Sequence, residues 1–332
     1  MERILLSHGS GGKNSKKLLE FIYNGLGKIV VNLGEDSGIA EIQSEKIAIT
    51  TDSYTIEPIF FSGGNIGKLA ICGTLNDLAM VGAIPKYLTL AFILEENFAI
   101  EDLKKILSSI RKESESAGIK IIAGDTKIVS KGKLDKIFIN TAGVGTIEHS
   151  QNINSKNAQV GDAIIVTGEI GNHGAAIMAY RNEFQTELCS DCASVSPLIQ
   201  NLLNANIEIH TLRDPTRGGL ASILNEIASA SSVDIELDER EIPINDSVNG
   251  ICDILGMDPL YMACEGRAII VSPESEANKI LKILKKTVAA KNAKKIGKVT
   301  KKSDKPRLYL KTFIGSKRIL PLLSRELTPR IC

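Results

Sequence analysis

The chain has 332 residues, of which 43% are hydrophobic, 24% charged and 4% aromatic, and its formal net charge is +1. A nearly balanced charge creates no overall field that would attract nucleic acid or a membrane, and so few aromatic side chains argue against stacking on single-stranded nucleic acid. Neither an apolar run of about 18 residues nor a hydrophobic leader is present, and six cysteines are too few for a disulfide scaffold. We therefore expect a cytoplasmic protein of two domains.

The first half of the chain alternates short apolar runs with helical patterns. These patterns predict strands at 46–51, 87–94, 119–123 and 136–147, and helices at 65–80 and 100–117. The last of these helices is the clearest, because apolar residues recur at helical spacing and Gly118 follows in the usual C-terminal position. The polar stretch 148–161 has no long apolar run and predicts a domain boundary.

The same alternation returns after this boundary. We predict strands at 162–168, 233–237 and 267–272, a loop that enters a helix at 171–181, and helices at 196–206, 217–230 and 274–291. From about residue 303, three prolines interrupt any long regular element, so we expect a strand near 307–311 and then an extended or loosely helical tail. The expected units are 1–150, 151–312 and a mobile tail, 313–332.

Glycine marks the first candidate site, the sequence HGSGG at 8–12. Gly9, Gly11 and Gly12 precede a helix that we expect to begin near Asn14 or Ser15, and glycines before a helix allow a backbone to approach an anion closely. The segment lacks the Gly-Lys-Ser/Thr ending of a P-loop and the spacing of a dinucleotide fingerprint. The residues alone are also consistent with a flexible N-terminal loop.

Dispersed aspartates form the second candidate site. Asp52 and Asp125 follow apolar runs and should lie at strand ends, where α/β folds often bind ligands. Asp77 falls inside a helical pattern beside apolar residues, where a carboxylate is costly unless a partner compensates its charge. With Asp36 and Asp214, these side chains supply the hard oxygen ligands that Mg²⁺ prefers. Each aspartate alone could instead form a turn or a helix cap.

Two further segments combine charge with glycine. In RDPTRGGL, Arg213 and Arg217 could bind phosphate, or the segment could be a surface turn with a helix cap. In CEGRAII, Glu265 precedes an apolar strand and could act as a general base, although an ion pair with Arg267 is the simpler reading of the pattern.

Cys332 is the last residue of this sequence and follows a segment without a regular pattern. Ten extended residues reach at most roughly 33 Å, so a thiol there resembles a carrier arm more than a nucleophile beside its base. The sequence alone is also consistent with an incidental terminal cysteine. Cys189 and Cys192 form a lone CxxC, which does not predict structural zinc, and His173 stands among small residues that would let it lie near a ligand.

Taken in order, HGSGG, TTDSY, TLNDLAMVGAIP, GDTK, GNHGAA, RDPTRGGL, EGRA and PRIC resemble the HypE family of nickel–iron hydrogenase maturation factors across nearly the whole chain. The HypE family is grouped with aminoimidazole ribonucleotide synthetase, selenophosphate synthetase and thiamine-monophosphate kinase. The resemblance implies an α+β fold with two domains: an N-terminal ATP-binding and dimerisation domain, whose sheet pairs with a second copy to form a barrel, and a C-terminal α/β sandwich domain. It also implies a flexible C-terminal tail.

The resemblance also implies roles for residues. Asp36, Asp52, Asp77 and Asp214 match the family's Mg–phosphate aspartates, and Asp125, Thr126 and Lys127 match its nucleotide-site strand end. Lys127 and Glu265 match positions that look catalytic. Cys332 matches the cysteine that carries the carbamoyl group.

The implied activity is ATP-dependent dehydration of an S-carbamoyl group on Cys332 to a thiocyanate. The carbamoyl group comes from a HypF carbamoyltransferase, and the cyanide goes to iron on a HypC–HypD scaffold. Two other hypotheses remain: an ATP-dependent phosphotransferase acting on a small molecule in solution, and a non-catalytic thiol carrier. The terminal cysteine argues against the first, and the aspartates with Glu265 argue against the second.

Overall fold

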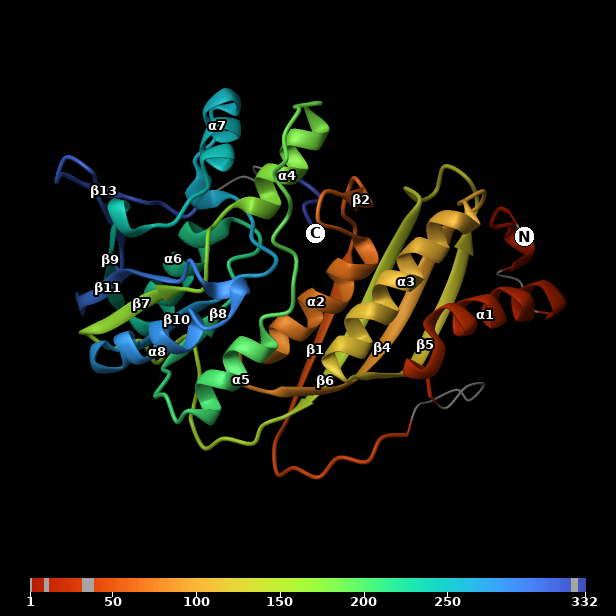
Figure 1. The fold of residues 1–332 in the computed structure, drawn as a ribbon, viewed down its shortest axis with the longest axis horizontal. Helices are drawn as coiled ribbons and strands as arrows, with labels where there is room; N and C mark the ends of the chain where they lie inside the picture. Colours follow the sequence, from red (N-terminus) through yellow and green to blue (C-terminus); the bar gives the residue numbers. More distant parts are fainter. Residues whose placement is uncertain (1, 9–11, 32–38, 324–327) are drawn as a thin grey trace.

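The computed structural model describes residues 2–8, 12–31, 39–323 and 328–332. Figure 1 shows an N-terminal part, red to yellow, beside a C-terminal part, green to blue. Residues 148–161 connect the two and contain no helix or strand. In the described part of the chain, no helix is both long and apolar enough to cross a membrane.

A four-stranded sheet in the order β1-β6-β4-β5 organises the N-terminal part. Its strands are β1 (Ile47–Tyr54), β4 (Ile84–Glu95), β5 (Lys120–Val129) and β6 (Ile137–Thr146). Strand β6 is antiparallel to both β1 and β4, whereas β5 is parallel to β4. A short hairpin is formed by β2 (Phe60–Phe61) and β3 (Gly64–Asn65).

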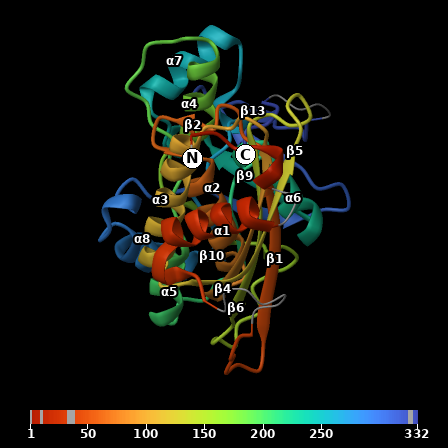
Figure 2. The same ribbon diagram turned by 90° about the vertical axis from the view of Figure 1, so that its right-hand side faces the viewer.

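Three helices cover one face of this sheet. They are α1 (Gly12–Leu26), α2 (Ile66–Ala79) and α3 (Ile100–Ala117). Helix α2 packs on β1 and β6, α3 packs beside α2, and α1 packs against α3, as Figure 2 shows from the side of α1. Helix α3 ends at Gly118, whose φ of +66° confirms the predicted glycine cap.

The other face of the N-terminal sheet carries apolar side chains that the three helices do not cover. On β4, Leu90, Phe92 and Leu94 are buried under the helices, so their neighbour Ile93 points to the opposite face and is exposed. Ile47 and Ile49 of β1 are exposed as well, and the strand register places them on the same face as Ile93. Among the described residues, this outer face is therefore an apolar surface that no helix covers.

The C-terminal part contains a seven-stranded sheet in the order β13-β12-β9-β11-β7-β10-β8. Its strands are β7 (Asp162–Val166), β8 (Thr211–Arg213), β9 (Val233–Asp238), β10 (Ile269–Pro273), β11 (Lys294–Lys302), β12 (Leu308–Lys311) and β13 (Lys317–Ile319). The helices are α4 (Asn172–Arg181), α5 (Ser196–Asn204), α6 (Gly219–Ser231), α7 (Asp246–Leu255) and α8 (Ala277–Leu284). Short 3₁₀ segments are Leu6–His8, Gly27–Ile29, Glu239–Glu241, Pro259–Tyr261, Glu274–Glu276 and Val288–Ala290.

Helices lie on both faces of this second sheet. Along β7, Ile164 and Val166 pack in the cluster that includes α6, while Ala163 and Ile165 pack in the cluster that includes α5 and α8. Every residue of β7 is therefore buried, which explains why the strand is a continuous apolar run instead of an alternating one.

The structure corrects several expected elements. The helix predicted at 274–291 is shorter, because only Ala277–Leu284 is α-helical and 3₁₀ turns flank it. Helix α7 and strands β8, β11 and β13 were not predicted. The tail is not simply extended or loosely helical, since β13 pairs with β12 and the C-terminus lies between α4 and β2 in Figure 1.

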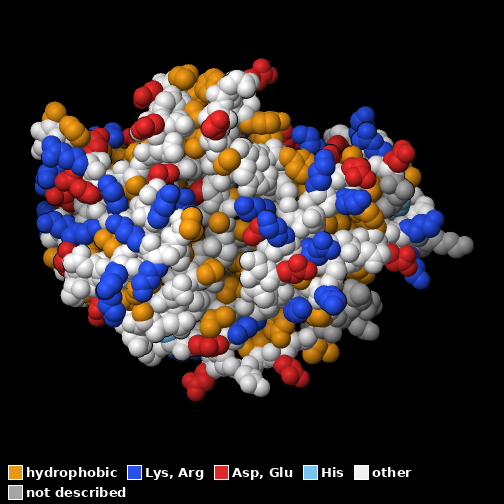
Figure 3. All heavy atoms as spheres, in the orientation of Figure 1, with side chains coloured by type: hydrophobic (Ala, Val, Ile, Leu, Met, Phe, Trp, Pro, Cys, Tyr) orange, Lys and Arg blue, Asp and Glu red, His pale blue; other side chains and the backbone are white. Residues whose placement is uncertain are grey.

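Strand β11 is rich in lysine. Its lysines face outward while Ile296 and Val299 enter the core. Figure 3 shows Lys and Arg side chains gathered over the side of the molecule where β9, β11 and β13 lie.

Candidate functional site

A cleft of about 430 Å³ lies where the two parts of the chain meet. That volume falls within the range of roughly 300–1,000 Å³ that is usual for small-molecule sites. The cleft is lined by Thr51, Asp52, Ser53 and Tyr54 of β1, Gly73 and Asp77 of α2, Asn140 of β6, Asp214, Thr216 and Arg217 after β8, Glu265 and Cys332. Five residues of the predicted site thus line one cleft with Cys332.

Strand β1 positions Asp52 through contacts with its neighbours. Asn140 donates its side-chain N–H to the backbone oxygen of Asp52 at 2.8 Å, and the Tyr54 hydroxyl donates to the Asp52 carboxylate at 3.1 Å. A side chain at Gly73 would put its Cβ 2.4 Å from the Tyr54 hydroxyl oxygen. The glycine in α2 therefore permits the close approach that orients Tyr54 and, through it, Asp52.

Three carboxyl groups in the cleft repel one another. Burial and the nearby charge of Asp77 raise the pKa of Asp52 to about 6, and the same two causes raise the pKa of Asp214 to about 7. Asp77 itself accepts a hydrogen bond from the Thr50 hydroxyl at 2.7 Å. A positive charge placed among these groups would favour their ionised forms.

The carboxylate oxygens of the cleft fit a Mg²⁺ site only if a further ligand completes the coordination. Carboxylate oxygens with raised pKa values are hard donors that a divalent cation would stabilise. Within the described ranges, however, no three His, Cys, Asp or Glu side chains are arranged to hold a metal ion by themselves. Phosphate oxygens would complete such a site, because Mg²⁺ commonly binds one or two carboxylates together with substrate phosphates.

Glu265 is the most buried carboxyl group of the cleft, with 2% of its surface exposed. Its backbone N–H donates to Asp191 at 3.2 Å, and its side-chain Oε1 has no hydrogen-bond partner among the described residues. Burial, followed by the charges of Asp214, Asp191 and Asp52, raises the pKa of Glu265 well above its ordinary value. A carboxyl group with a raised pKa can act as a general base once it ionises.

Gly266 fixes the backbone beside Glu265. A Cβ at this position would lie 1.9 Å from the backbone oxygen of Asp191. Only glycine allows the chain carrying Glu265 to pack so closely on the segment that leads from α4 to α5.

Cys332 reaches the cleft from the C-terminal segment. The backbone N–H of Thr55 donates to the backbone oxygen of Cys332 at 3.1 Å, and the Thr55 hydroxyl donates to the same oxygen at 3.3 Å. Ile331 is buried in the N-terminal core cluster, which also includes Ile177 and Ala263 of the C-terminal part. The side chain predicted to carry the reacting group is therefore in the same cleft as Glu265. No disulfide bond links the six cysteines, all of which the structure describes.

Among the described residues, five predicted site residues do not line this cleft within one chain: Gly12, Asp125, Thr126, Lys127 and Arg213. Asp125, Thr126 and Lys127 lie on β5, three strand spacings from β1, which corresponds to roughly 14 Å across the sheet. Lys127 forms an ion pair with Asp125 at 3.0 Å, and both belong to the outer face because they pair with Ile93 and Ala91. Arg213 binds Glu226 at 2.9 Å, so only Arg217 of the two predicted arginines lines the cleft.

Asp125 and Thr126 instead line a second cavity. This cavity lies between β5 and α1 and is also lined by Leu19, Tyr23 and Phe92. Gly9, Gly11 and Asp36 lie outside the described residues, and Gly12 is the first residue of α1.

Several residues that contact the site were not predicted from the sequence. Tyr54 and Asn140 position Asp52, Asp191 contacts Glu265, and Thr55 contacts Cys332. Thr55 uses its backbone N–H, which has no sequence signal. For Tyr54 a signal exists, since it lies two residues from Asp52 and therefore on the same face of the strand.

Family models match both parts of the chain. The model of the AIR synthase related protein N-terminal domain matches residues 34–147, and that of the C-terminal domain matches residues 159–308. Among relatives, carbamoyl dehydratase HypE of Escherichia coli (strain K12) is 40% identical over all of this chain and all of its own. Carbamoyl dehydratase HypE of Rhizobium leguminosarum bv. viciae is 41% identical over 99% of this chain and 95% of its own.

Solved structures agree with this match. A crystal structure of hydrogenase maturation protein HypE in complex with ATP has a TM-score of 0.94 and 38% identity, covering 99% of this chain and all of that one. A crystal structure of a HypE–HypF complex contains a chain with a TM-score of 0.80 and 45% identity, covering 83% of this chain and 90% of that one. Two thiamine-monophosphate kinase structures with TM-scores of 0.64 and 0.66 share the fold at 16% and 18% identity. The chain belongs to the HypE family of carbamoyl dehydratases, among the AIR synthase related proteins.

Proposed function

We propose that this protein dehydrates an S-carbamoyl group on its own Cys332 to a thiocyanate and consumes one ATP in doing so. One observation carries the proposal: Cys332 lies in the cleft that contains Asp52, Asp77, Asp214 and the buried Glu265. The relatives named carbamoyl dehydratase and the HypE structure with ATP support the reaction and its nucleotide.

The reaction needs ATP because an amide oxygen is a poor leaving group. In the first step the carbamoyl oxygen attacks the γ-phosphorus of ATP, which gives an iso-amide phosphate and ADP and releases one N–H proton. In the second step the remaining N–H proton leaves with phosphate, and the carbon–nitrogen triple bond of S–C≡N forms. The net change in the carbamoyl group is loss of the elements of one water molecule. These elements convert ATP to ADP and phosphate.

The residues of the cleft have different roles in these two steps. Glu265 accepts a proton from the nitrogen, since its Oε1 is buried and otherwise without a hydrogen-bond partner in the described structure. Asp52, Asp77 and Asp214, with Asp36 outside the described residues, would hold Mg²⁺ together with phosphate oxygens. When bound, the ion supplies charge stabilisation at the transferring phosphoryl group. Arg217 adds a positive charge to the same cleft.

We further propose that the protein acts as a homodimer through the outer face of the N-terminal sheet. Exposed Ile47, Ile49 and Ile93 make this face apolar, and Asp125 and Lys127 lie on it. A second copy facing this surface would form the expected barrel, and it would supply Lys127 to the cleft of its partner. Gly9, Gly11, Asp125, Thr126 and Lys127 then contribute to the nucleotide site of the assembly.

The partners follow from the same chemistry. A carbamoyltransferase of the HypF type would load Cys332, in agreement with the HypE–HypF structure. A HypC–HypD scaffold would receive the cyanide. Since Cys332 must reach each of these in turn, we propose that the last residues of the tail 313–332 leave the cleft between steps.

ATP turnover in matched variants tests the proposal against its two alternatives. We expect carbamoyl-loaded protein to release ADP and phosphate, whereas Cys332→Ser releases neither. Hydrolysis that continues in Cys332→Ser would indicate a phosphotransferase that acts on a small molecule in solution. No ATP consumption in the loaded wild type would indicate a thiol carrier.

A further inference from the structure

Helix α4 contacts the C-terminal segment from one side while the N-terminal part contacts it from the other. We call residues 328–332 the terminal segment. Its Ile331 side chain is 1% exposed, and Cys332 lies in the cleft. The terminal segment is thus inserted between the two parts of the chain at the point where they meet.

The backbone of the terminal segment accepts two hydrogen bonds from the residues that follow β1. The N–H of Thr55 donates to the oxygen of Cys332 at 3.1 Å, and the N–H of Glu57 donates to the oxygen of Arg330 at 3.3 Å. Arg330 has a φ of +51°, in the left-handed region that side chains rarely adopt. A conformation of this kind persists only when surrounding contacts hold it.

Two side chains of α4 supply such contacts, and both bind backbone oxygens. His173, in the first turn, places Nε2 2.8 Å from the oxygen of Ile331. Arg181, the last residue of the helix, donates to the oxygen of Arg330 at 2.8 Å and through Nε to the oxygen of Glu57 at 2.8 Å. Arg181 therefore links the terminal segment to the N-terminal part directly.

The hydrogen bonds of His173 define its tautomer. The oxygen of Ile331 can only accept, so Nε2 must carry the proton and Nδ1 must accept. Ser190 Oγ lies 2.7 Å from Nδ1, and it accepts from the N–H of Cys192 at 3.1 Å, which leaves its own hydrogen for Nδ1. The ring is fully buried and lies edge-on to Phe61, with centroids 5.4 Å apart. Ser190 thus keeps His173 oriented as a donor toward the terminal segment.

We propose that His173 and Arg181 form a latch that positions Cys332 for dehydration and whose release allows Cys332 to be loaded. Both are positioning residues, since they hold the backbone of residues 330 and 331 and leave the Cys332 side chain to the cleft. Because the latch binds only backbone, it accepts the thiol, the carbamoylated and the thiocyanate forms alike. The role of the latch in the reaction rests on the proposed function. The hydrogen bonds that form the latch do not depend on that proposal.

Alkylation of two cysteines in one chain tests the latch. Cys332 is half-buried in the docked segment, so iodoacetamide should react faster with it when the terminal segment leaves the cleft, and the exposed Cys189 provides an internal reference. The ratio of the two rates is measured by peptide mass in wild type, His173→Leu, His173→Gln, Arg181→Met and Arg181→Lys. ATP affinity and single-turnover dehydration are measured on the same proteins.

Loss of one buried hydrogen bond should raise the Cys332 to Cys189 ratio by about tenfold in His173→Leu. Dehydration should slow by up to about tenfold as the docked population falls, with ATP affinity within about twofold of wild type. His173→Gln should restore most of the wild-type ratio, because its amide nitrogen can replace Nε2 as donor. Arg181→Lys should restore little, since an ammonium cannot reproduce the planar fork that binds two oxygens.

An unchanged ratio in folded His173→Leu and Arg181→Met would overturn the latch. Equal acceleration at both cysteines would overturn it as well, because that result reports opening of the segment around residue 189. If His173→Leu does not fold, Arg181→Met and Arg181→Lys test the latch instead, because Arg181 is only half-buried. If the wild type itself fails to dehydrate, the proposed function is wrong, while the alkylation ratio still decides the latch.

Discussion

Glu265 shows how burial prepares a carboxyl group for proton transfer. Its pKa is raised well above the ordinary value by desolvation and by three neighbouring carboxyl groups. Replacement by glutamine preserves the shape of the side chain but removes the base.

We therefore predict that Glu265→Gln slows single-turnover dehydration by at least about 100-fold, the usual minimum contribution of a general base. ATP binding should persist, which nucleotide titration will check. Glu115→Gln, at an exposed position of α3, serves as the control and should behave as wild type. Dehydration at the wild-type rate in Glu265→Gln would show that another group accepts the proton.

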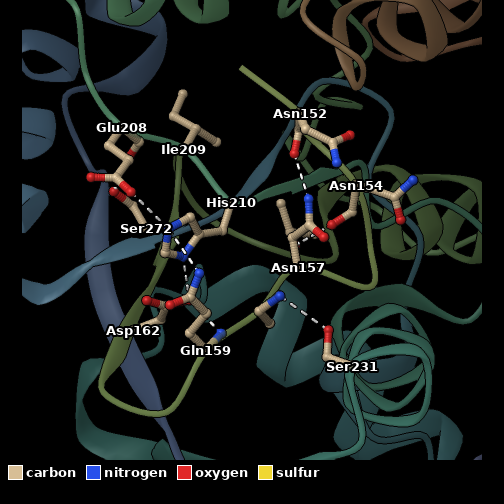
Figure 4. Close-up of polar contacts among 12 residues, drawn as sticks. Asn152, Asn154, Asn157, Gln159, Asp162, Glu208, Ile209, His210, Ser231 and Ser272 are labelled. Carbon is tan, nitrogen blue, oxygen red and sulfur yellow. Dashed lines mark hydrogen bonds and ion pairs between the residues drawn. The ribbon is translucent and has the colours of Figure 1, made fainter. Parts of the chain in front are cut away.

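A second polar cluster, away from the cleft, affects stability instead of catalysis. Figure 4 shows His210 between Asp162 and Glu208, with Nδ1 2.8 Å from the Asp162 carboxylate and Nε2 3.0 Å from that of Glu208. Burial lowers the pKa of His210, but the hydrogen bonds and charges of Asp162 and Glu208 outweigh burial and raise it overall. The protonated ring therefore stabilises the fold.

Because the pKa of His210 is higher in the folded state than in the unfolded state, its protonation stabilises the fold. This stabilisation is complete below the unfolded pKa of 6.5 and is lost as the pH rises through the folded pKa. We predict that the melting temperature of wild type exceeds that of His210→Gln most at acidic pH, and that this difference shrinks above neutrality. Thermal unfolding of both proteins between about pH 5.5 and 9 measures it. A difference that grows with pH would contradict the assignment.

At the scale of elements, the sequence predicts those whose apolar residues follow one clear period. Helix α3 was predicted at Ile100–Ala117, because its stripe and its glycine cap are both local signals. Strand β11 was not predicted, since Ile296 and Val299 are its only buried apolar residues and the rest of the strand is mostly lysine. Helix α7 was missed because a glycine lies in its interior and few of its residues reach the core.

The candidate site was predictable only in part for a related physical reason. Asp77 could be identified because a carboxylate beside apolar residues in a helix needs a compensating partner. The meeting of Asp52, Asp214 and Glu265 depends on contacts between segments far apart in the chain, which spacing does not encode. Part of the docking of the terminal segment comes from backbone N–H groups of Thr55 and Glu57, which almost any residue would provide.

The turn beside Glu265 offers a test of how closely two segments must pack. We predict that Gly266→Ala destabilises the protein by about 1–3 kcal/mol, because the new Cβ must displace the backbone of Asp191. Dehydration should fall with it, since Glu265 moves. Chemical denaturation measures the first effect and single-turnover mass analysis the second.

Gly250 in α7 provides the matched control. A Cβ there meets nothing within 4 Å, so Gly250→Ala should stabilise the protein by up to about 1 kcal/mol through helix propensity and leave activity unchanged. Equal effects of the two substitutions would show that packing at Gly266 is unimportant.

At the scale of the whole molecule, Lys127 is separated from the cleft of its own chain, so a catalytic Lys127 would have to come from a second copy. One chain places Lys127 on β5 and Asp52 on β1, at opposite edges of the same sheet. In the proposed dimer, a second copy on the apolar outer face would supply its own Lys127 to the cleft. The proposed dimer thus accounts both for the exposed isoleucines and for a predicted catalytic lysine that its own cleft lacks.

Mixed dimers distinguish action within one chain from action across the interface. Lys127→Ala and Glu265→Gln should each be inactive, but a mixture should recover about a quarter of wild-type dehydration, because half of the dimers contain one complete cleft. Activity is measured after the two proteins are unfolded and refolded together. If Lys127 serves its own chain, no mixture recovers activity.

The central claim is that the protein performs chemistry on its own Cys332, and the mass of the intact chain tests it most directly. Protein carbamoylated at Cys332 should lose the mass of one water when Mg-ATP is added, while Cys332→Ser should never acquire the carbamoyl group. Retention of the carbamoyl mass, with ATP unconsumed, would contradict the account and leave a protein that carries the group without transforming it.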